Sequence, residues 1–337
     1  MHLVAQTSRQ TPQNNGAAHP NATRSNPSRS GNPAKRAAGV QHPLGRVTFS
    51  DWVAGARLRT LTLAIGPVAA GTGAAVLLTD PEVVHWVRAL LCLAVALCLQ
   101  IGVNYANDYS DGIRGTDAHR VGPARLTGSG VVEPKRVLTV ALVFFGLAAV
   151  AGLLLVIASQ QWWLIAVGAV AILAAWFYTG GKRPYGYAGL GELVVFIFFG
   201  LVATAGSTYV QVLDVNLESW LAGVALGLVA CAVLMVNNIR DIAQDKVAGK
   251  RTLAVLVGAR WAKVLFCVFL LAPFVIVGFL ALLYPIAWFV LFALLLALPA
   301  CLIAVTAKTP PELILALQLT SFTGLLMGLG LGAAFAL

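Results

Sequence analysis

Charged residues are scarce in this chain. Asp, Glu, Lys and Arg make up 11% of its 337 residues, whereas 59% are hydrophobic. A soluble domain of this length needs a larger charged surface, so the composition excludes a soluble enzyme. It indicates an integral membrane protein that crosses the bilayer several times.

Cysteine is also rare, and none of it has the Cys-x-x-Cys spacing of a zinc or redox site. The five cysteines all lie within apolar runs, which predicts reduced thiols packed in the interior and no disulfide framework. They are Cys92, Cys98, Cys231, Cys267 and Cys301.

Residues 1–45 contain almost no large apolar side chains. They are rich in Gln, Asn, Ser, Pro, Gly, Ala and Arg. Such a segment cannot bury enough surface to offset its ordering entropy, which predicts a disordered basic tail. It also lacks the apolar core of a signal peptide, so we expect no cleavage there.

The remainder, residues 46–337, contains nine apolar runs. Each run has roughly 18–24 residues, enough to cross a hydrocarbon core of about 30 Å at about 1.5 Å per residue. This pattern predicts an all-α integral membrane domain with nine transmembrane helices. The runs are 61–78, 86–106, 137–158, 162–179, 190–212, 220–237, 261–283, 286–305 and 312–335.

The basic residues predict the orientation. With nine spans, every one of the 23 Lys and Arg residues except Arg88 falls on the same side of the membrane as the N-terminus. The positive-inside rule therefore predicts a cytoplasmic N-terminus in a cell-membrane protein. Because these residues occupy short loops rather than one face of a domain, the net charge of +10 does not indicate nucleic-acid binding.

Two polar clusters adjoin the second and sixth apolar runs, on the predicted cytoplasmic side. A carboxylate at mid-bilayer costs about 2.5–3.5 kcal/mol on insertion scales, so such residues near apolar helices indicate a functional site. Their spacing of 133 residues suggests an internal repeat, which would bring the clusters face to face across a central cavity. The clusters are Asn104, Asn107, Asp108, Asp111 and Asp117, and Asn237, Asp241 and Asp245.

On a helix, Asn104, Asp108 and Asp111 lie within about 60° of one another. The second cluster has the i, i+4, i+8 spacing, which also forms one stripe. Oxygen ligands without His or Cys favour Mg²⁺, which completes its coordination with substrate phosphates. The basic residues predicted to contact such phosphates are Arg114, Lys182, Arg183, Lys246, Lys250 and Arg251.

Two other interpretations use the same residues. Asn and Asp at either site can be plain caps of a helix end, although a carboxylate at a helix C-terminus opposes the helix dipole. A cation transporter also uses intramembrane carboxylates, but its charges are expected near mid-bilayer in broken helices. Here the clusters lie at the ends of the runs beside basic loops, which favours a site for metal and anion together.

Four segments in this order resemble the UbiA superfamily of intramembrane aromatic prenyltransferases, over about residues 50–337. The second and third segments resemble the branch that prenylates 1,4-dihydroxy-2-naphthoate. The segments are Asn107-Asp108-Tyr109-Ser110-Asp111, Gly122-Pro123-Ala124-Arg125-Leu126-Thr127-Gly128-Ser129-Gly130, Arg183-Pro184-Tyr185-Gly186-Tyr187 and Asn237-Asn238-Ile239-Arg240-Asp241.

The resemblance implies a nine-helix bundle around a cavity open to lipid, and two Mg²⁺ ions that bridge a polyprenyl diphosphate. In this sequence Asp108, Asp111 and Asp117 would bind one ion, and Asp241 and Asp245 the other. The acceptor ring would attack the allylic cation and lose its carboxyl group, giving demethylmenaquinone in menaquinone biosynthesis. Tyr178 and Tyr185 are candidates to stabilise that cation through their rings.

The residues at the diphosphate end do not distinguish between acceptors, because that end would be the same for any acceptor. Alternatives within the superfamily are 4-hydroxybenzoate, homogentisate, haem and a glycerol phosphate ether. The expected partners are thus polyprenyl diphosphate, an aromatic acceptor and membrane lipid.

Overall fold

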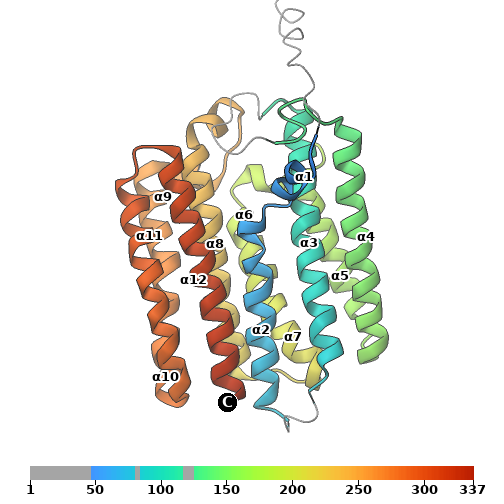
Figure 1. Ribbon diagram of the computed structural model, residues 1–337, viewed down its shortest axis with the longest axis vertical. Coiled ribbons are helices and arrows are strands. Elements are labelled where there is room, and N and C mark those ends of the chain that lie inside the picture. The colour runs from blue at the N-terminus through green and yellow to red at the C-terminus, as the bar shows by residue number, and fades with distance from the viewer. Residues whose placement is uncertain (1–46, 80–83, 117–124) are drawn as a thin grey trace, which may run out of the picture. The chain divides into compact units, whose positions relative to one another are not determined.

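The computed structural model describes residues 47–79, 84–116 and 125–337, shown in Figure 1. Contacts divide the chain into the units Met1–Pro43 and Leu44–Leu337, and the fold below is that of the second. The predicted tail and the predicted metal ligand Asp117 lie outside the described residues.

Within the described part of the chain, every regular element is a helix. The elements in chain order are α1 (Phe49–Gly55), η2 (Leu58–Thr60), α2 (Thr62–Val76), α3 (Trp86–Ile113), α4 (Pro134–Ser159), α5 (Leu164–Phe177), η4 (Tyr185–Ala188), α6 (Gly191–Val195), η5 (Phe196–Val202), α7 (Ala203–Val212), α8 (Leu217–Val247), α9 (Leu253–Leu271), α10 (Pro273–Leu283), η6 (Pro285–Ala293), α11 (Leu294–Thr306) and α12 (Pro310–Ala336).

Each of the nine predicted apolar runs coincides with one of these helices or with a consecutive set of them, and the long helices run side by side (Figure 1). Among the described residues, seven helical segments are long and apolar enough to cross a membrane. Helices α2 and α5 are apolar but shorter, with 15 and 14 residues. The all-helical, multi-pass architecture is therefore confirmed, and the count of nine spans stays a prediction.

The helices that carry the polar clusters extend past the predicted apolar runs, as the prediction of both polar stripes on helices requires. The second run was expected to end at residue 106, but α3 continues to Ile113. Likewise α8 continues to Val247 rather than ending at residue 237. Asp108 and Asp111 are each only 2% exposed, so this end of α3 is packed inside the protein. The helix continues because these side chains find partners inside the protein.

Glycines allow α2 and α12 to pack closely. A Cβ added at Gly328 would lie 2.3 Å from the Cα of Gly66, and one added at Gly73 would lie 2.1 Å from the backbone oxygen of Gly332. Small residues at helix contacts are how membrane helices approach each other without a hydrophobic driving force. This contact fixes α2 beside α12, and α2 in turn contributes to the functional cavity.

A π-helical segment, η5, interrupts the long segment between α6 and α7. At this point Gly200 packs against Gly223 and Gly227 of α8 at backbone distance. The wider π turn changes which side chains face inward, and two of its aromatic residues, Phe198 and Phe199, line the cavity.

Arg88, the basic residue predicted on the other side of the membrane, closes the opposite end of the helices. Its guanidinium donates to the carbonyl oxygens of Val210 at 2.8 Å and Ala158 at 2.8 Å. These oxygens belong to the last turns of α7 and α4, where carbonyls lack helical partners and the helix dipole is negative. Arg88 therefore ties three helices together.

Candidate active site

A cavity of about 890 Å³ joins the two polar clusters. The ends of α3 and α8, 133 residues apart in the sequence, both contribute oxygen-bearing side chains to it. The predicted convergence of the clusters is therefore correct. The lining residues predicted from the sequence are Asn104, Asn107, Asp108, Asp111, Tyr178, Tyr185, Asn237, Asp241, Asp245 and Lys250.

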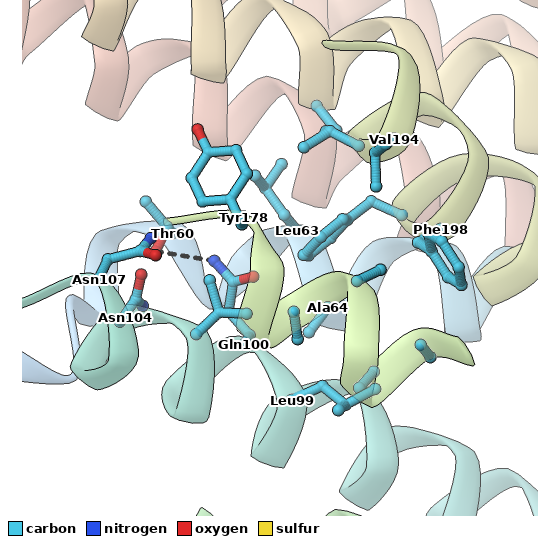
Figure 2. Close-up of a pocket in the computed structure, with 18 of the residues that line it drawn as sticks. Thr60, Leu63, Ala64, Leu99, Gln100, Asn104, Asn107, Tyr178, Val194 and Phe198 are labelled. Atoms are coloured by element: carbon cyan, nitrogen blue, oxygen red, sulfur yellow. Dashed lines mark hydrogen bonds between the residues drawn. The ribbon is translucent and has the colours of Figure 1, made fainter. Parts of the chain in front are cut away.

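The cavity changes from polar to apolar along α3. Asn104 and Asn107 lie near Tyr178 at one side of the close-up in Figure 2, and Leu99 and Phe198 lie further along. Beyond them the lining is almost entirely aliphatic and reaches Cys92, close to the first turn of α3. The cavity thus has a polar end, lined by carboxylates and amides, and a long apolar part lined by hydrocarbon side chains, called the hydrocarbon chamber below.

Gln100 stands at the boundary between these two parts. Its Nε2 donates to the hydroxyl of Thr60 at 3.2 Å, the dashed line in Figure 2. This bond links α3 to the short helix η2 that precedes α2, and so holds one wall of the cavity.

Asp108 is bound by backbone amides. Its Oδ2 accepts from the N–H of Leu126 at 2.9 Å, and its Oδ1 accepts from the N–H of Thr127 at 2.8 Å. Both amides belong to the loop before α4, at the start of the described range 125–337. Asp108 therefore anchors that segment to α3.

Asp111 is bound by cations and a phenol. Arg125 Nη1 lies 2.7 Å from its Oδ2, and Lys250 Nζ lies 3.1 Å from its Oδ1. The hydroxyl of Tyr187 also donates to Oδ1. Three segments that are distant in the sequence thus meet at one buried carboxylate.

The asparagines of the first cluster orient neighbouring segments. Asn104 donates from Nδ2 to the carbonyl oxygen of Ala56 at 2.9 Å. Asn107 accepts at Oδ1 from the hydroxyl of Thr179 at 2.7 Å. These bonds fix the chain before α2 and the chain after α5 against α3.

In the second cluster, Asp241 is paired with its neighbour Arg240. The guanidinium donates from Nε to Oδ1 at 2.7 Å and from Nη2 to Oδ2 at 2.6 Å. Nη2 also donates to Oδ1 of Asn237 at 2.7 Å. One turn further along α8, Asp245 accepts from the hydroxyl of Thr252 at 3.5 Å.

Glu192 contacts α8 next to this cluster, outside the cavity. It is 5% exposed and accepts from Nδ2 of Asn238 at 3.1 Å. Since Glu192 does not line the cavity, its contact orients the helix that carries Asn237 rather than reaching a ligand.

The aromatic residues form a wall beside the carboxylates. The rings of Tyr178 and Tyr185 meet edge to face with centroids 5.6 Å apart. Tyr187 holds the ammonium of Lys250 at 4.7 Å from its ring centroid. Burial, reinforced by the charge of Asp111, raises the pKa of Tyr187 well above its ordinary range, so this phenol remains a hydrogen-bond donor at neutral pH.

Five of the predicted phosphate-binding residues do not line the cavity. Arg114 instead donates to the carbonyl oxygens of Thr179 and Gly181, and so clamps the chain after α5. The other four residues are exposed, Lys246 in the last turn of α8 and the rest in loops. They are Lys182, Arg183, Lys246 and Arg251.

Several lining residues were not assigned as candidates from the sequence. Arg125, Tyr187 and Arg240 stand inside the quoted motifs, next to or between predicted ligands, and that adjacency was the available signal. Arg57 was found only in the structure. It lines the cavity with a left-handed backbone (φ 54°), which is unusual for a residue with a side chain.

The donor set fits Mg²⁺. Carboxylate and amide oxygens line the polar end of the cavity, and its described lining residues include no His. In the described ranges, no group of three or more His, Cys, Asp or Glu side chains lies close enough to enclose a metal by protein ligands alone. Mg²⁺ matches this arrangement because it binds one or two carboxylates and takes its other ligands from water and substrate phosphates.

A helical membrane bundle with two facing carboxylate clusters and a hydrocarbon chamber is an arrangement suited to a lipid-linked anion. The chain belongs to the UbiA prenyltransferase family, whose model matches residues 64–313. A relative from Mycobacterium tuberculosis, 1,4-dihydroxy-2-naphthoate octaprenyltransferase, is 51% identical over 260 residues, 77% of this chain and 83% of its own length. The Bacillus subtilis protein of the same name is 32% identical over 285 residues, 82% of this chain and 90% of its own length.

Solved structures have the same fold. A UbiA homologue from Aeropyrum pernix superposes with a TM-score of 0.61 at 17% identity, over 79% of this chain and 96% of that chain. A UbiA homologue from Archaeoglobus fulgidus, bound to GPP and Mg²⁺, superposes with a TM-score of 0.55 at 14% identity, over 84% of this chain and 99% of that chain.

Proposed function

We propose that this protein transfers a polyprenyl group from polyprenyl diphosphate to 1,4-dihydroxy-2-naphthoate. The observation that carries the proposal is the convergence of Asp111 with Asp241 and Asp245 in one cavity that continues into a hydrocarbon chamber. Relatives that are 51% and 32% identical and bear the name of this activity support the choice of acceptor.

The polar end of the cavity is the diphosphate site. Asp111, Asp241 and Asp245, with Asn237 alongside, would supply oxygen ligands to two Mg²⁺ ions bound together with the diphosphate. When bound, the metal acts as a Lewis acid that takes up negative charge on the departing pyrophosphate. The basic lining residues Lys250 and Arg125 add fixed positive charge at the same place.

The apolar chamber holds the polyprenyl chain and keeps water away. Its aliphatic walls on α3, α4, α5 and α7 leave few groups that hydrogen-bond to water. The exposed apolar faces of these helices contact membrane lipid, into which the distal part of a long chain extends. The edge-to-face pair of Tyr178 and Tyr185 presents ring faces near the carboxylates, where positive charge develops on the allylic carbon.

In the reaction, the bond between the allylic carbon and the diphosphate oxygen breaks, and pyrophosphate leaves with the electron pair. The ring carbon that carries the carboxylate forms the new carbon–carbon bond. The carboxylate then leaves as CO₂ and returns its electron pair to the ring, so the step balances without a further proton acceptor. The product is the hydroquinone form of demethylmenaquinone.

The orientation belongs to the same proposal. Nine spans, a cytoplasmic N-terminus and a cell-membrane location put the carboxylate end of the cavity on the cytoplasmic side, as the basic loops predict. Single cysteines at Lys182 and Asp214, in a background without the native cysteines, test this. A membrane-impermeant maleimide added to intact cells should label Asp214→Cys and leave Lys182→Cys unlabelled, and the reverse result would contradict the orientation.

The activity is tested with the full chain in lipid nanodiscs, polyprenyl diphosphate and 1,4-dihydroxy-2-naphthoate, with and without Mg²⁺. Mass spectrometry should detect prenylated naphthoquinol only when Mg²⁺ is present. Loss of a charged group that stabilises the leaving group costs about 100-fold or more in rate, which is the effect expected of Asp241→Asn. Asp214→Asn, an exposed change outside the cavity, is the matched control and should keep full activity.

Other acceptors decide between branches of the family. Turnover with 4-hydroxybenzoate or homogentisate, but not with the naphthoate, would retain the diphosphate chemistry and overturn the acceptor. Absence of product with every aromatic acceptor, in protein that elutes as a single folded species, would overturn the proposed function.

A further inference from the structure

Two of the cavity carboxylates are neutralised by the protein's own basic side chains. The Arg240–Asp241 pair is bidentate, with contacts of 2.7 and 2.6 Å. The side chains of Arg240 and Asp241 are 4% and 11% exposed, so this is a buried ion pair with little solvent screening. The same guanidinium reaches Asn237, which makes it part of the polar cluster itself.

The first cluster repeats this arrangement with different residues. Arg125 and Lys250 contact the two oxygens of Asp111, and their side chains are 9% and 11% exposed. Tyr187 holds Lys250 over its ring and donates to the same carboxylate. One carboxylate of each cluster is therefore paired with a buried cation that also lines the cavity.

The paired oxygens are the ones that a metal ion needs. A metal that binds Asp241 must take oxygens that the guanidinium of Arg240 now contacts. Removing one partner of a buried ion pair is strongly unfavourable because it leaves an uncompensated charge. A guanidinium that loses its carboxylate can instead bind phosphate oxygens, for which its planar donors are well suited.

We propose that Arg240 holds the place of the metal at Asp241 and moves onto the diphosphate when metal and diphosphate bind together. In the same way, Arg125 and Lys250 occupy the oxygens of Asp111 and move onto the diphosphate when both ligands bind. This inference rests on the proposed function and adds a rule of binding to it. Metal alone binds weakly, because it strands a buried cation, and diphosphate alone binds weakly, because it faces carboxylates. Each ligand therefore strengthens the other by the same factor.

Removal of Arg240 should accordingly change the coupling between the two ligands. The test is equilibrium dialysis of Mn²⁺ against the full chain in nanodiscs, at fixed free Mn²⁺, with and without inorganic pyrophosphate. For the natural sequence, pyrophosphate should tighten Mn²⁺ binding about tenfold or more, within the usual 5–150-fold range of coupling between sites.

Three variants sharpen the measurement. In Arg240→Gln, Mn²⁺ alone should bind at least about fivefold more tightly and the effect of pyrophosphate should shrink by a similar factor. Arg240→Lys keeps the charge but cannot contact both oxygens, so it should fall between the two. It also serves if the glutamine variant does not fold. Arg136→Gln removes the same charge from an exposed pair with Glu133 and should match the natural sequence.

The outcomes separate the two proposals. Equal coupling in the natural sequence and in both Arg240 variants would overturn the exchange, while leaving the metal–diphosphate site in place. Weaker Mn²⁺ binding in Arg240→Gln without pyrophosphate would also overturn it. No binding of Mn²⁺ to the natural sequence, even with pyrophosphate, would instead remove the proposed function on which the inference rests.

Discussion

Oδ1 of Asp108 accepts a hydrogen bond from the backbone N–H of Thr127 at 2.8 Å, and Oδ2 accepts one from the next amide back at 2.9 Å. Asp108 and Asp111 are three residues apart on one helix, yet their partners differ in kind. Asp108 contacts backbone, whereas Asp111 contacts charged side chains and a phenol. The two carboxylates that looked equivalent in the sequence therefore have different local tasks, the first anchoring a chain segment and the second pairing with basic side chains that line the cavity.

Asp108→Asn should destabilise the protein. An asparagine amide can accept only one of the two backbone hydrogen bonds, so one buried N–H loses its partner at a cost of about 1–3 kcal/mol. Thermal unfolding in detergent, followed by the fluorescence of a thiol-reactive dye, should show a lower midpoint. Asp241→Asn is the comparison for activity. If both variants lose activity with unchanged midpoints, the anchoring role of Asp108 is wrong.

Arg114 and Lys182 should behave differently although both were predicted to bind phosphate. Arg114 clamps the carbonyls of Thr179 and Gly181, so Arg114→Met should lower the unfolding midpoint by a few degrees, about 2–4 °C for a loss near 1 kcal/mol. Lys182 is exposed, and Lys182→Met should leave the midpoint unchanged.

The same pair of variants tests the remaining prediction for Lys182. If its ammonium reaches the diphosphate, Lys182→Met raises KM for polyprenyl diphosphate severalfold without changing the midpoint. An unchanged KM would remove Lys182 from the site.

Gly328→Ala should separate α2 from α12. The new Cβ would lie 2.3 Å from the Cα of Gly66, which forces backbone movement and costs about 1–3 kcal/mol as overpacking. Gly146→Ala is the matched control, because nothing lies within 4 Å of its added Cβ and alanine favours a helix. A lower unfolding midpoint for Gly328→Ala only is expected, and equal midpoints would contradict the close contact.

Removal of divalent metal should abolish turnover reversibly. Excess EDTA should reduce product formation to background, and Mg²⁺ or Mn²⁺ added above the chelator should restore it, because the cavity offers hard oxygen ligands to both. Helix content measured by circular dichroism should not change. Full activity in EDTA would exclude a metal-assisted departure of pyrophosphate.

Much of the candidate site could be predicted from the sequence, because carboxylates next to apolar membrane spans cost free energy and are therefore rare. Asp111 and Asp241 stand out among apolar runs, and helical spacing alone places Asp245 and Asn237 on the same face. The basic residues were harder. A lysine or arginine in a loop has the same sequence signature whether it contacts phosphate, lipid or water, so Lys250 in the cavity could not be told from Lys182 outside it.

The burial of the first cluster could not be predicted from the sequence. The apolar run of α3 ends near residue 106, and only the partners supplied by Leu126, Thr127 and Arg125 allow the helix to carry Asp108 and Asp111 onward in a buried environment.

By itself the sequence determined three features: an apolar composition suited to a membrane, the alternation of apolar runs with polar loops, and a site whose ligands are hard oxygens. Composition, periodicity and side-chain type are local properties, so they can be read from the sequence alone. Only the tertiary structure decided which carboxylates meet which cations. The pairing of Asp241 with Arg240 depends on rotamers, and that of Asp111 with Lys250 joins positions 139 residues apart. Such contacts are set by packing, which no single segment encodes.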